Sequence, residues 1–151
     1  MSLQIRSASL NDLPRLIELL SQLSLEDQRE DLSAPTPTAY VTALEEIDAY
    51  PLQTLLVAEV GDVIVGMALF IQIPNLSHVG RPHAMVEDVV VDSAHRGNGY
   101  GEALMRHAVD LARDAGCYKL VLTSNKARDD AHRFYRRIGF DATHEGFRID
   151  F

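Results

Sequence analysis

A glycine-rich stretch from Arg96 to Gly101 is the part of the sequence best suited to binding chemistry. Its glycines let the backbone turn tightly and approach a ligand closely. An apolar helical pattern begins directly after it, so the free N–H groups and the positive dipole end of that helix would face the same gap. Such a gap suits a phosphate or diphosphate, and the guanidinium of Arg96 could add a forked donor. The alternative is a glycine-rich connection that holds no ligand.

The spacing of these glycines separates the stretch from other phosphate-binding loops. No lysine follows Gly101, as a nucleotide P-loop would require. The glycines are spaced GxGxG rather than GxGxxG, and they follow the fourth predicted strand, whereas a dinucleotide-binding fold carries them after the first. A nucleoside triphosphate site or a dinucleotide site is therefore disfavoured.

Strands and helices alternate along the chain in the manner of a mixed sheet covered by helices. Alternation or short apolar runs predict strands at 3–8, 55–60, 63–71, 84–91 and 119–123, and residues 140–151 could supply one or two closing strands. Helical spacing of apolar residues predicts helices at about 13–23, 37–48, 101–115 and 129–138. Gly61-Asp62 between two apolar runs predicts a β-hairpin. We therefore expect one α/β (α+β) domain over residues 1–151.

Composition excludes several classes of protein. The 151 residues are 46% apolar and 24% charged, which is ordinary for a globular chain. A single cysteine, Cys117, excludes an internal disulfide framework and suits a reducing cytoplasm. The apolar run 63–71 is too short to cross a membrane, and the six histidines lack metal-ligand spacing. A net charge of −8 argues against nucleic-acid binding, which usually needs a basic face.

Charge is unevenly distributed along the chain. Residues 1–92 hold four basic and fourteen acidic residues, whereas residues 93–151 hold ten basic and eight acidic residues. The most acidic stretch, 26–48, has seven acids against Arg29 alone. Two interpretations stay open. The stretch is either a solvated loop and helix face, or a mouth that attracts a cationic substrate while the C-terminal half tolerates a polyanion.

Three motifs together resemble the GNAT superfamily of N-acetyltransferases. The family pattern [R/Q]xxGx[G/A], between a central strand and a long helix, is filled by Arg96, Gly99 and Gly101. The strand before it, 86–92, resembles the fourth strand of the family, and residues 131–140 resemble its AxxFYxxxGF segment. The order of elements also matches, so the resemblance covers nearly the whole chain.

The resemblance implies a fold and an acetyl donor. We expect a mixed sheet of six to seven strands with about four helices on both faces. The fourth and fifth strands should part at a β-bulge, so that the pantetheine arm of acetyl-CoA lies between them and the glycine-rich stretch holds the diphosphate. The residues expected to bind acetyl-CoA are Val89, Val90, Val91, Arg96, Gly97, Asn98, Gly99, Tyr100, Gly101, Asn125, Arg128 and Arg133. For Arg128 and Arg133, solvated helix charges are the alternative.

Acid and base residues are also implied by the resemblance. Transfer to an amine needs a base, because most amines are protonated at pH 7. Glu87 occupies the strand position where the family often places a carboxylate, and we favour it over the neighbouring Asp88 or a water relay. Tyr135 matches the family's usual acid, which protonates the leaving thiolate, although it could instead be a core residue.

The acceptor is less constrained than the donor. Residues 87–91 and 116–120 resemble glucosamine-6-phosphate N-acetyltransferases, whereas residues 123–135 resemble aminoalkylphosphonate N-acetyltransferases. We expect a small primary amine, with Glu87, Asp88 and His83 lining its site, and by resemblance a homodimer. The alternatives are a peptide or protein amine, or a regulatory module that binds acetyl-CoA without turnover. No metal, nucleic acid or membrane partner is expected.

Overall fold

The structure is a computed structural model that describes residues 1–23 and 28–151. The chain divides into two compact units, Met1–Val121 and Leu122–Phe151, and each is described by itself. The acidic stretch 26–48 therefore begins in residues outside the described part. The single domain expected over residues 1–151 stays a prediction.

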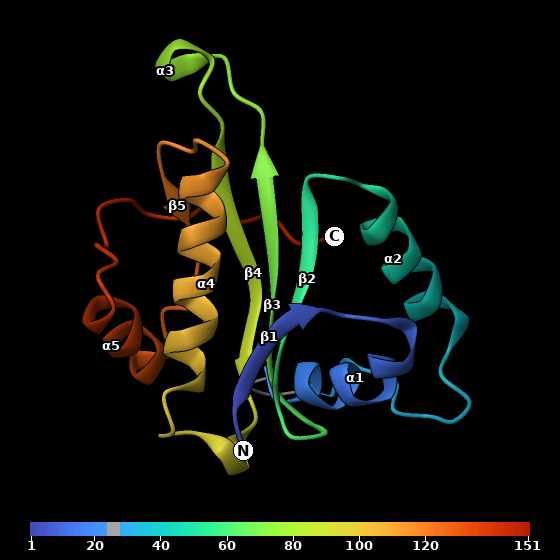
Figure 1. The fold of residues 1–151 in the computed structure, drawn as a ribbon. Coiled ribbons are helices and arrows are strands. Elements are labelled where there is room, and N and C mark those ends of the chain that lie inside the picture. The colour runs from blue at the N-terminus through green and yellow to red at the C-terminus, as the bar shows by residue number, and fades with distance from the viewer. Residues whose placement is uncertain (24–27) are drawn as a thin grey trace. The chain divides into compact units, whose positions relative to one another are not determined.

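The first unit is built on a mixed sheet, as expected (Figure 1). Within the described residues it has five strands: β1 (Leu3–Ser7), β2 (Gln53–Val60), β3 (Val63–Ile73), β4 (His83–Val91) and β5 (Leu120–Val121). They lie side by side in that order. The first four pair antiparallel, and β4 pairs parallel with β5. The fold class is confirmed.

The strand count is lower than the predicted six to seven. The predicted strand at 119–123 is only two residues long, and residues 140–151 form no strand in the structure. The side chains of Phe147, Ile149 and Phe151 in this segment are exposed. A strand needs a neighbour that pairs with its backbone, and the described second unit contains no other strand.

The four predicted helices are present within two residues of their expected ends. The helices of the first unit are α1 (Leu13–Ser21), α2 (Thr38–Ala49), the short α3 (Ser77–Gly80) and α4 (Tyr100–Asp114), and the second unit contains α5 (Asp129–Arg137). The turn α3 lies between β3 and β4, and two of its residues, His78 and Val79, have left-handed φ angles of 54° and 59°. None of the helices in the described residues could cross a membrane.

Helices cover both faces of the sheet in the first unit. Leu55 and Val57 of β2 belong to one core cluster with buried leucines of α1 and α2. Because side chains alternate along a strand, the buried Leu56 and Ala58 face the opposite side. Figure 1 shows α4 on that side and α1 and α2 on the other. The sheet is thus a rigid platform, and its strand ends carry the candidate site.

Candidate functional site

Strand β4 is interrupted by a bulge at the predicted carboxylates. Glu87 pairs with Leu69 of β3, but the next pair joins Val90 to Met67, so β4 has one extra residue there. Asp88 has a φ of 52°, in the left-handed region that side-chain-bearing residues rarely adopt. A regular strand would turn Glu87 and Asp88 to opposite faces. In the bulge, both residues are exposed.

The edge of β4 that faces away from β3 loses its pairing with β5 just before the bulge. Pairing with β5 consists of Ala84 with Leu120 and Met85 with Val121. From residue 86 onward, β4 has no ladder partner on that side among the described residues. The pairing of β4 with β5 therefore stops at Met85, and the predicted parting of the two strands around a ligand stays a prediction. A free strand edge can pair with an extended chain that carries amides, so this edge fits a pantetheine arm.

Val89, Val90 and Val91 on this edge differ in which of their atoms could contact a ligand. The side chain of Val90 is buried in the core, so only its backbone could face a ligand. Val89 and Val91 are half-buried. The carbonyl of Val91 accepts a hydrogen bond from Arg96 Nε at 3.2 Å, so Arg96 crosses back to the strand end. The two terminal nitrogens of Arg96 have no hydrogen-bond partner among the described residues.

Residues 96–99, called the glycine turn from here on, connect β4 to α4 through open space. Gly97 and Gly99 have φ angles of 81° and 78°. A Cβ atom added at either glycine would meet nothing within 4 Å. Among the described residues, no acceptor is found for the backbone N–H groups of residues 97–102. Free N–H groups at a helix N-terminus attract anions, so the turn fits the diphosphate of acetyl-CoA.

The glycine turn is followed by Tyr100 and Gly101, the first residues of α4. Gly101 is buried and Tyr100 is half-buried. Glu102 is the acidic residue of this first turn, but its carboxylate accepts from Arg106 Nη2 at 2.6 Å, one turn farther along α4. The charge of Glu102 is thus partly compensated by a neighbour on the same helix.

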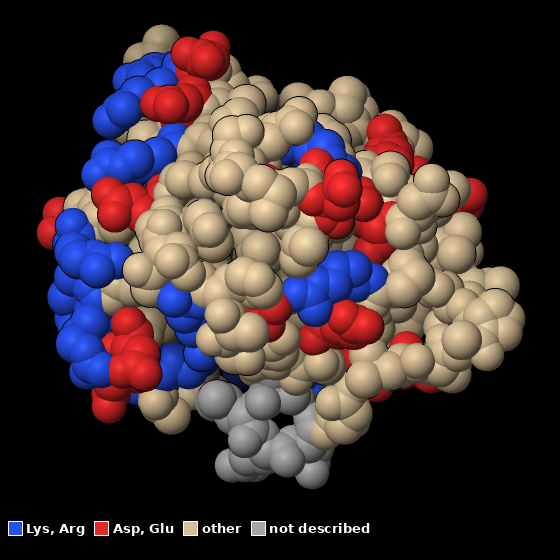
Figure 2. All heavy atoms as spheres, turned by 60° about the horizontal axis from the view of Figure 1, so that its bottom comes forward, with Lys and Arg blue, Asp and Glu red and all other residues tan. Residues whose placement is uncertain are grey.

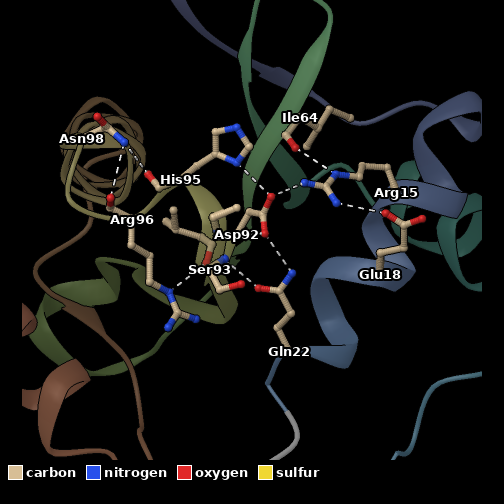
Figure 3. Close-up of polar contacts among 11 residues, drawn as sticks. Arg15, Glu18, Gln22, Ile64, Asp92, Ser93, His95, Arg96 and Asn98 are labelled. Atoms are coloured by element: carbon tan, nitrogen blue, oxygen red, sulfur yellow. Dashed lines mark hydrogen bonds and ion pairs between the residues drawn. The ribbon is translucent and has the colours of Figure 1, made fainter.

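Asp92 lies directly after β4 and is the one polar or charged residue that is buried in the described part of the chain, with 7% of its surface exposed. Its carboxylate accepts from Arg15 Nη2 at 2.6 Å, Gln22 Nε2 at 3.1 Å and His95 Nδ1 at 2.9 Å (Figure 3). The hydrogen bond from Gln22 is the largest cause that lowers the pKa of Asp92, and those from Arg15 and His95 act in the same direction. Asp92 therefore stays ionised.

Sequence reasoning missed this cluster, which we call the Asp92 cluster and which consists of Arg15, Gln22, Asp92, Ser93 and His95. One signal was available, because an acidic residue between a buried strand and a glycine-rich turn needs partners. The identity of the partners was not available. Gln22 and Arg15 lie 70 and 77 residues from Asp92 in sequence, and only the packing of α1 on the sheet brings them together.

Asp88 has charged neighbours that lie far from it in the sequence. The pKa of Asp88 is raised, chiefly because surrounding protein atoms desolvate its carboxyl group, and further because the carboxylate of Glu30 lies nearby. Arg29 acts in the opposite direction. Glu30 itself accepts a hydrogen bond from the hydroxyl of Tyr40 in α2, at 2.8 Å. A raised pKa suits a general base, so Asp88 is a candidate base in its own right.

His83 lies at the far end of β4 from these carboxylates. It is half-buried, and its Nδ1 atom is buried with no hydrogen-bond partner among the described residues. Its ring is tilted against that of Tyr118, with centroids 6.1 Å apart. Four residues of strand separate His83 from Glu87, a distance of roughly 13 Å at 3.3 Å per residue. The first unit does not bring these two residues together, and the role of His83 in an acceptor site stays a prediction.

The second unit contains the predicted acid. Tyr135 lies half-buried on α5, and its ring packs against Phe134 and Phe140, with centroids 5.3 and 5.9 Å away. Burial raises the pKa of Tyr135, and Arg128 acts in the opposite direction. The hydroxyl therefore stays protonated at neutral pH, as a proton donor must.

The other predicted residues of the second unit mostly shape α5. Asn125 Oδ1 accepts from the Ala127 N–H at 2.9 Å, so its side chain forms the turn before the helix. Arg128 is the N-cap residue of α5. Arg133 is exposed and forms an ion pair with Asp130 on the same helix. Contacts of these residues with acetyl-CoA stay predictions.

Charge is mixed on the face drawn in Figure 2. Lys and Arg side chains gather along one edge of that view, and acidic side chains lie among them. The described residues contain no group of three or more His, Cys, Asp or Glu side chains that could hold a metal ion.

Comparison with known proteins agrees with this geometry. Residues 20–140 match the Acetyltransferase (GNAT) family. The rice protein named glucosamine 6-phosphate N-acetyltransferase 1 is 36% identical over 143 residues, which cover 91% of this chain and 80% of that protein. The glucosamine 6-phosphate N-acetyltransferase of Trypanosoma brucei brucei is 38% identical over 87 residues, 58% of this chain and 57% of that protein.

A solved structure agrees over almost the full length. The crystal structure of a protein named transcriptional regulator, from Bacillus halodurans C-125, has a TM-score of 0.94 and 38% identity. It covers 99% of this chain and 100% of that one. The family match spans both units and includes the bulge, the glycine turn and Tyr135. The chain therefore belongs to the GNAT family of N-acetyltransferases, enzymes that take their acetyl group from acetyl-CoA.

Proposed function

We propose that this chain transfers an acetyl group from acetyl-CoA to a primary amine of a small molecule, with both bound at once. One observation carries the proposal. Within a single segment, residues 86–101, a released strand edge, a bulge with two carboxylates and an open glycine turn follow one another. In acetyl-CoA, the amide-bearing arm likewise lies between the thioester and the diphosphate. The bulge would face the thioester, the strand edge the arm and the glycine turn the diphosphate. We further propose that the two units act together as one domain.

The released edge and the glycine turn would hold the donor. Backbone groups of Val89 and Val91 would bind the acetyl carbonyl and the pantetheine amides, and the N–H groups of Gly97 to Gly101 would bind the diphosphate. When bound, acetyl-CoA supplies an activated thioester. A backbone N–H aimed at its carbonyl oxygen contributes on the order of 3 kcal/mol to other acyl transfers.

Proton transfer would fall to the carboxylates of the bulge and to Tyr135. Asp88 or Glu87, directly or through a water, would take a proton from the ammonium form of the acceptor. The raised pKa of Asp88 supports this role for it, because the group then binds a proton more readily. The Tyr135 hydroxyl would give a proton to the leaving sulfur, and its raised pKa keeps that proton available at neutral pH.

The acceptor class is drawn from the relatives and from charge. Two relatives are named glucosamine 6-phosphate N-acetyltransferases, which supports an amino sugar phosphate as the first amine to test. The acidic residues Glu87, Asp88 and Glu30 near the bulge would attract the ammonium group. A homodimer and a cytoplasmic location are carried forward as proposals, the first from the resemblance and the second from the single cysteine.

A thiol-release assay tests the proposed function. The protein is mixed with acetyl-CoA and a panel of glucosamine 6-phosphate, an aminoalkylphosphonate, a polyamine and a peptide amine. At least one amine should release free CoA well above the rate without amine. In Tyr135→Phe, kcat should fall about 100-fold because the acid is lost, while the Kd for acetyl-CoA stays within twofold.

A second function is favoured by one name. The solved structure from Bacillus halodurans is called a transcriptional regulator, which suits a module that binds acetyl-CoA without turnover. Both functions predict that acetyl-CoA at 100 times its Kd adds about 2.7 kcal/mol to the stability. Binding with no thiol release from any amine supports the regulator. The absence of any shift in melting temperature with millimolar acetyl-CoA contradicts both functions.

A further inference from the structure

The proposed function leaves the Asp92 cluster unexplained. Its members do not belong to the strand edge, the bulge or the glycine turn. Nevertheless, Asp92 lies between β4 and that turn, and its carboxylate receives four hydrogen bonds, from Arg15, Gln22, His95 and the N–H of Ala94. Burying a carboxylate is unfavourable unless it is paired and hydrogen-bonded, so this arrangement needs a reason.

Two of the four donors are far away in sequence, Arg15 within α1 and Gln22 directly after its last residue. Arg15 also donates from Nε to the carbonyl of Ile64 in β3 at 3.0 Å, so it joins the end of β4 to the neighbouring strand. Gln22 makes two contacts with consecutive residues. Its amide nitrogen donates to Asp92, and its amide oxygen accepts from the backbone N–H of Ser93 at 2.9 Å (Figure 3). Arg15 and Gln22 are thus hydrogen-bonded to Asp92 and Ser93, the residues with which the chain leaves β4.

From Asp92, hydrogen bonds lead directly into the glycine turn. His95 donates its backbone N–H to the carbonyl of Asp92 at 2.8 Å and its Nδ1 contacts the carboxylate of Asp92. The carbonyl of His95 then accepts from Asn98 Nδ2 at 2.9 Å, and the carbonyl of Arg96 accepts from the same nitrogen at 3.4 Å. The conformation of the glycine turn is therefore set from its Asp92 end.

The glycine turn has two further hydrogen bonds at its ends: Arg96 Nε donates to the Val91 carbonyl at 3.2 Å, and the Ala103 N–H donates to the Gly99 carbonyl at 3.0 Å. Gly97 and Gly99 have no side chains, and nothing lies within 4 Å of the Cβ positions they lack. Glycine also loses more conformational freedom on ordering than any other residue. A turn of this kind binds an anion tightly only if it is already ordered, because otherwise the ordering entropy subtracts from the binding free energy.

We propose that Gln22 and Arg15, acting through Asp92, are positioning residues that preorganise the glycine turn for the diphosphate of acetyl-CoA. This inference rests on the proposed function, since it assumes that the turn binds the diphosphate. Neither residue touches acetyl-CoA in this proposal. Helix α1 therefore controls donor affinity from outside the donor site.

The test compares Gln22→Ala with Ser21→Ala. Ser21 is the adjacent residue on α1, and its hydroxyl donates to the Glu18 carbonyl at 2.6 Å, away from Asp92. The Kd for CoA, measured by isothermal titration calorimetry on folded protein, should rise about tenfold in Gln22→Ala, because hydrogen bonds to a charged group are lost. It should stay within twofold in Ser21→Ala. Gln22→Glu should weaken binding at least as much, since its carboxylate would face that of Asp92.

Hydrogen exchange on the protein without ligand gives an independent readout. In Gln22→Ala, the backbone N–H groups of His95 and Ala103 should exchange about tenfold faster. Gln22 contacts neither of them, and they bond to Asp92 and Gly99 respectively. Exchange in β2 and β3 should not change. A merely structural role would instead lower the melting temperature and leave both the Kd for CoA and these two exchange rates unaltered, which would overturn the proposal.

A donor without a diphosphate separates this inference from the proposed function. With S-acetylpantetheine, kcat/KM should be the same for wild type and Gln22→Ala, whereas with acetyl-CoA it should fall about tenfold. An equal fall with both donors would overturn the proposal, because the cluster would then act elsewhere. Failure of the wild type to bind CoA would refute the proposed function. The exchange rates would still show whether α1 orders the turn.

Discussion

The hairpin turn at Gly61-Asp62 and the glycine turn both place glycine at positive φ, but they are held in different ways. Gly61 has a φ of 62° and joins two strands that pair up to Val60 and Val63, directly beside the turn. The glycine turn joins a strand to a helix, and its conformation depends on side chains that come from Asp92, His95 and α1.

The surroundings of the two turns differ as well. A Cβ atom on Gly61 would approach the Met1 sulfur to 2.6 Å, whereas a Cβ atom on Gly97 or Gly99 would meet nothing within 4 Å. The hairpin turn uses glycine to reverse the chain. The glycine turn also keeps the space in front of its N–H groups clear. A glycine at positive φ therefore indicates a binding site only where the space beside its Cα atom is open.

The largest expected effect comes from filling that space. In Gly99→Val, the Kd for acetyl-CoA should rise by about 100-fold or more, because the side chain would occupy the position of the diphosphate and a β-branched residue is strained at φ 78°. The matched control is Gly61→Val, which has similar backbone strain, of about 1–2 kcal/mol. Chemical denaturation should show comparable losses of stability, provided that the fully exposed side chain of Met1 moves away from the new side chain at position 61. If both variants bound acetyl-CoA with equal affinity, the open space at the glycine turn would not be the diphosphate site.

A smaller effect is expected from removing the charge that supports the glycine turn. Asp92→Asn should lower the free energy of unfolding by about 2 kcal/mol at pH 7, since hydrogen bonds from Arg15 and Gln22 lose a charged acceptor. The pKa of Asp92 is lowered in the folded state. Its stabilisation is therefore complete above about pH 4, the ordinary pKa, and declines as the pH falls further.

Denaturation of wild type and Asp92→Asn between pH 7 and pH 2 measures how much the charge of Asp92 contributes to the free energy of unfolding. The gap between the two proteins should narrow below about pH 4, where the wild-type carboxylate begins to lose its advantage. A gap that is constant with pH would mean that charge on Asp92 does not support the turn.

The smallest effect is expected at Asp88, the non-glycine residue at positive φ in the bulge. Its pKa is raised in the folded state, so ionisation at neutral pH opposes folding. Asp88→Asn should therefore raise the melting temperature slightly at pH 7, and the gain should disappear below about pH 3.5, where the carboxyl group is protonated in both states. Asparagine also tolerates left-handed φ. A gain that is the same at pH 3 and pH 7 would refute a charge effect.

Much of the fold was predictable because it rests on local patterns. The helical spacing of apolar residues located α1, α2, α4 and α5 within two residues of their ends. The strand predicted at 119–123 is present but shorter, at Leu120–Val121, and the closing strands that residues 140–151 could have supplied are absent from the structure. Strand formation depends on a partner that is distant in sequence, and alternation of apolar residues alone does not supply one.

The candidate site divides in the same manner. The glycine turn, the two carboxylates and Tyr135 were predicted from short motifs in the sequence. The sequence favoured Glu87 as the base, and which carboxylate acts stays a prediction. The raised pKa of Asp88 could not be foreseen, because it depends on desolvation and on Glu30, which only folding brings near. The Asp92 cluster was missed for the same reason, since Gln22 and Arg15 reach it only when α1 packs on the sheet.

The sequence by itself determined that a strand, a glycine-rich turn and a helix follow one another, because these are properties of neighbouring residues. The tertiary structure decided which edge of β4 is unpaired, that the carboxyl group of Asp88 is desolvated and what holds the glycine turn in place. These are contacts between residues that are far apart in the chain, and they exist only after helices and strands have packed.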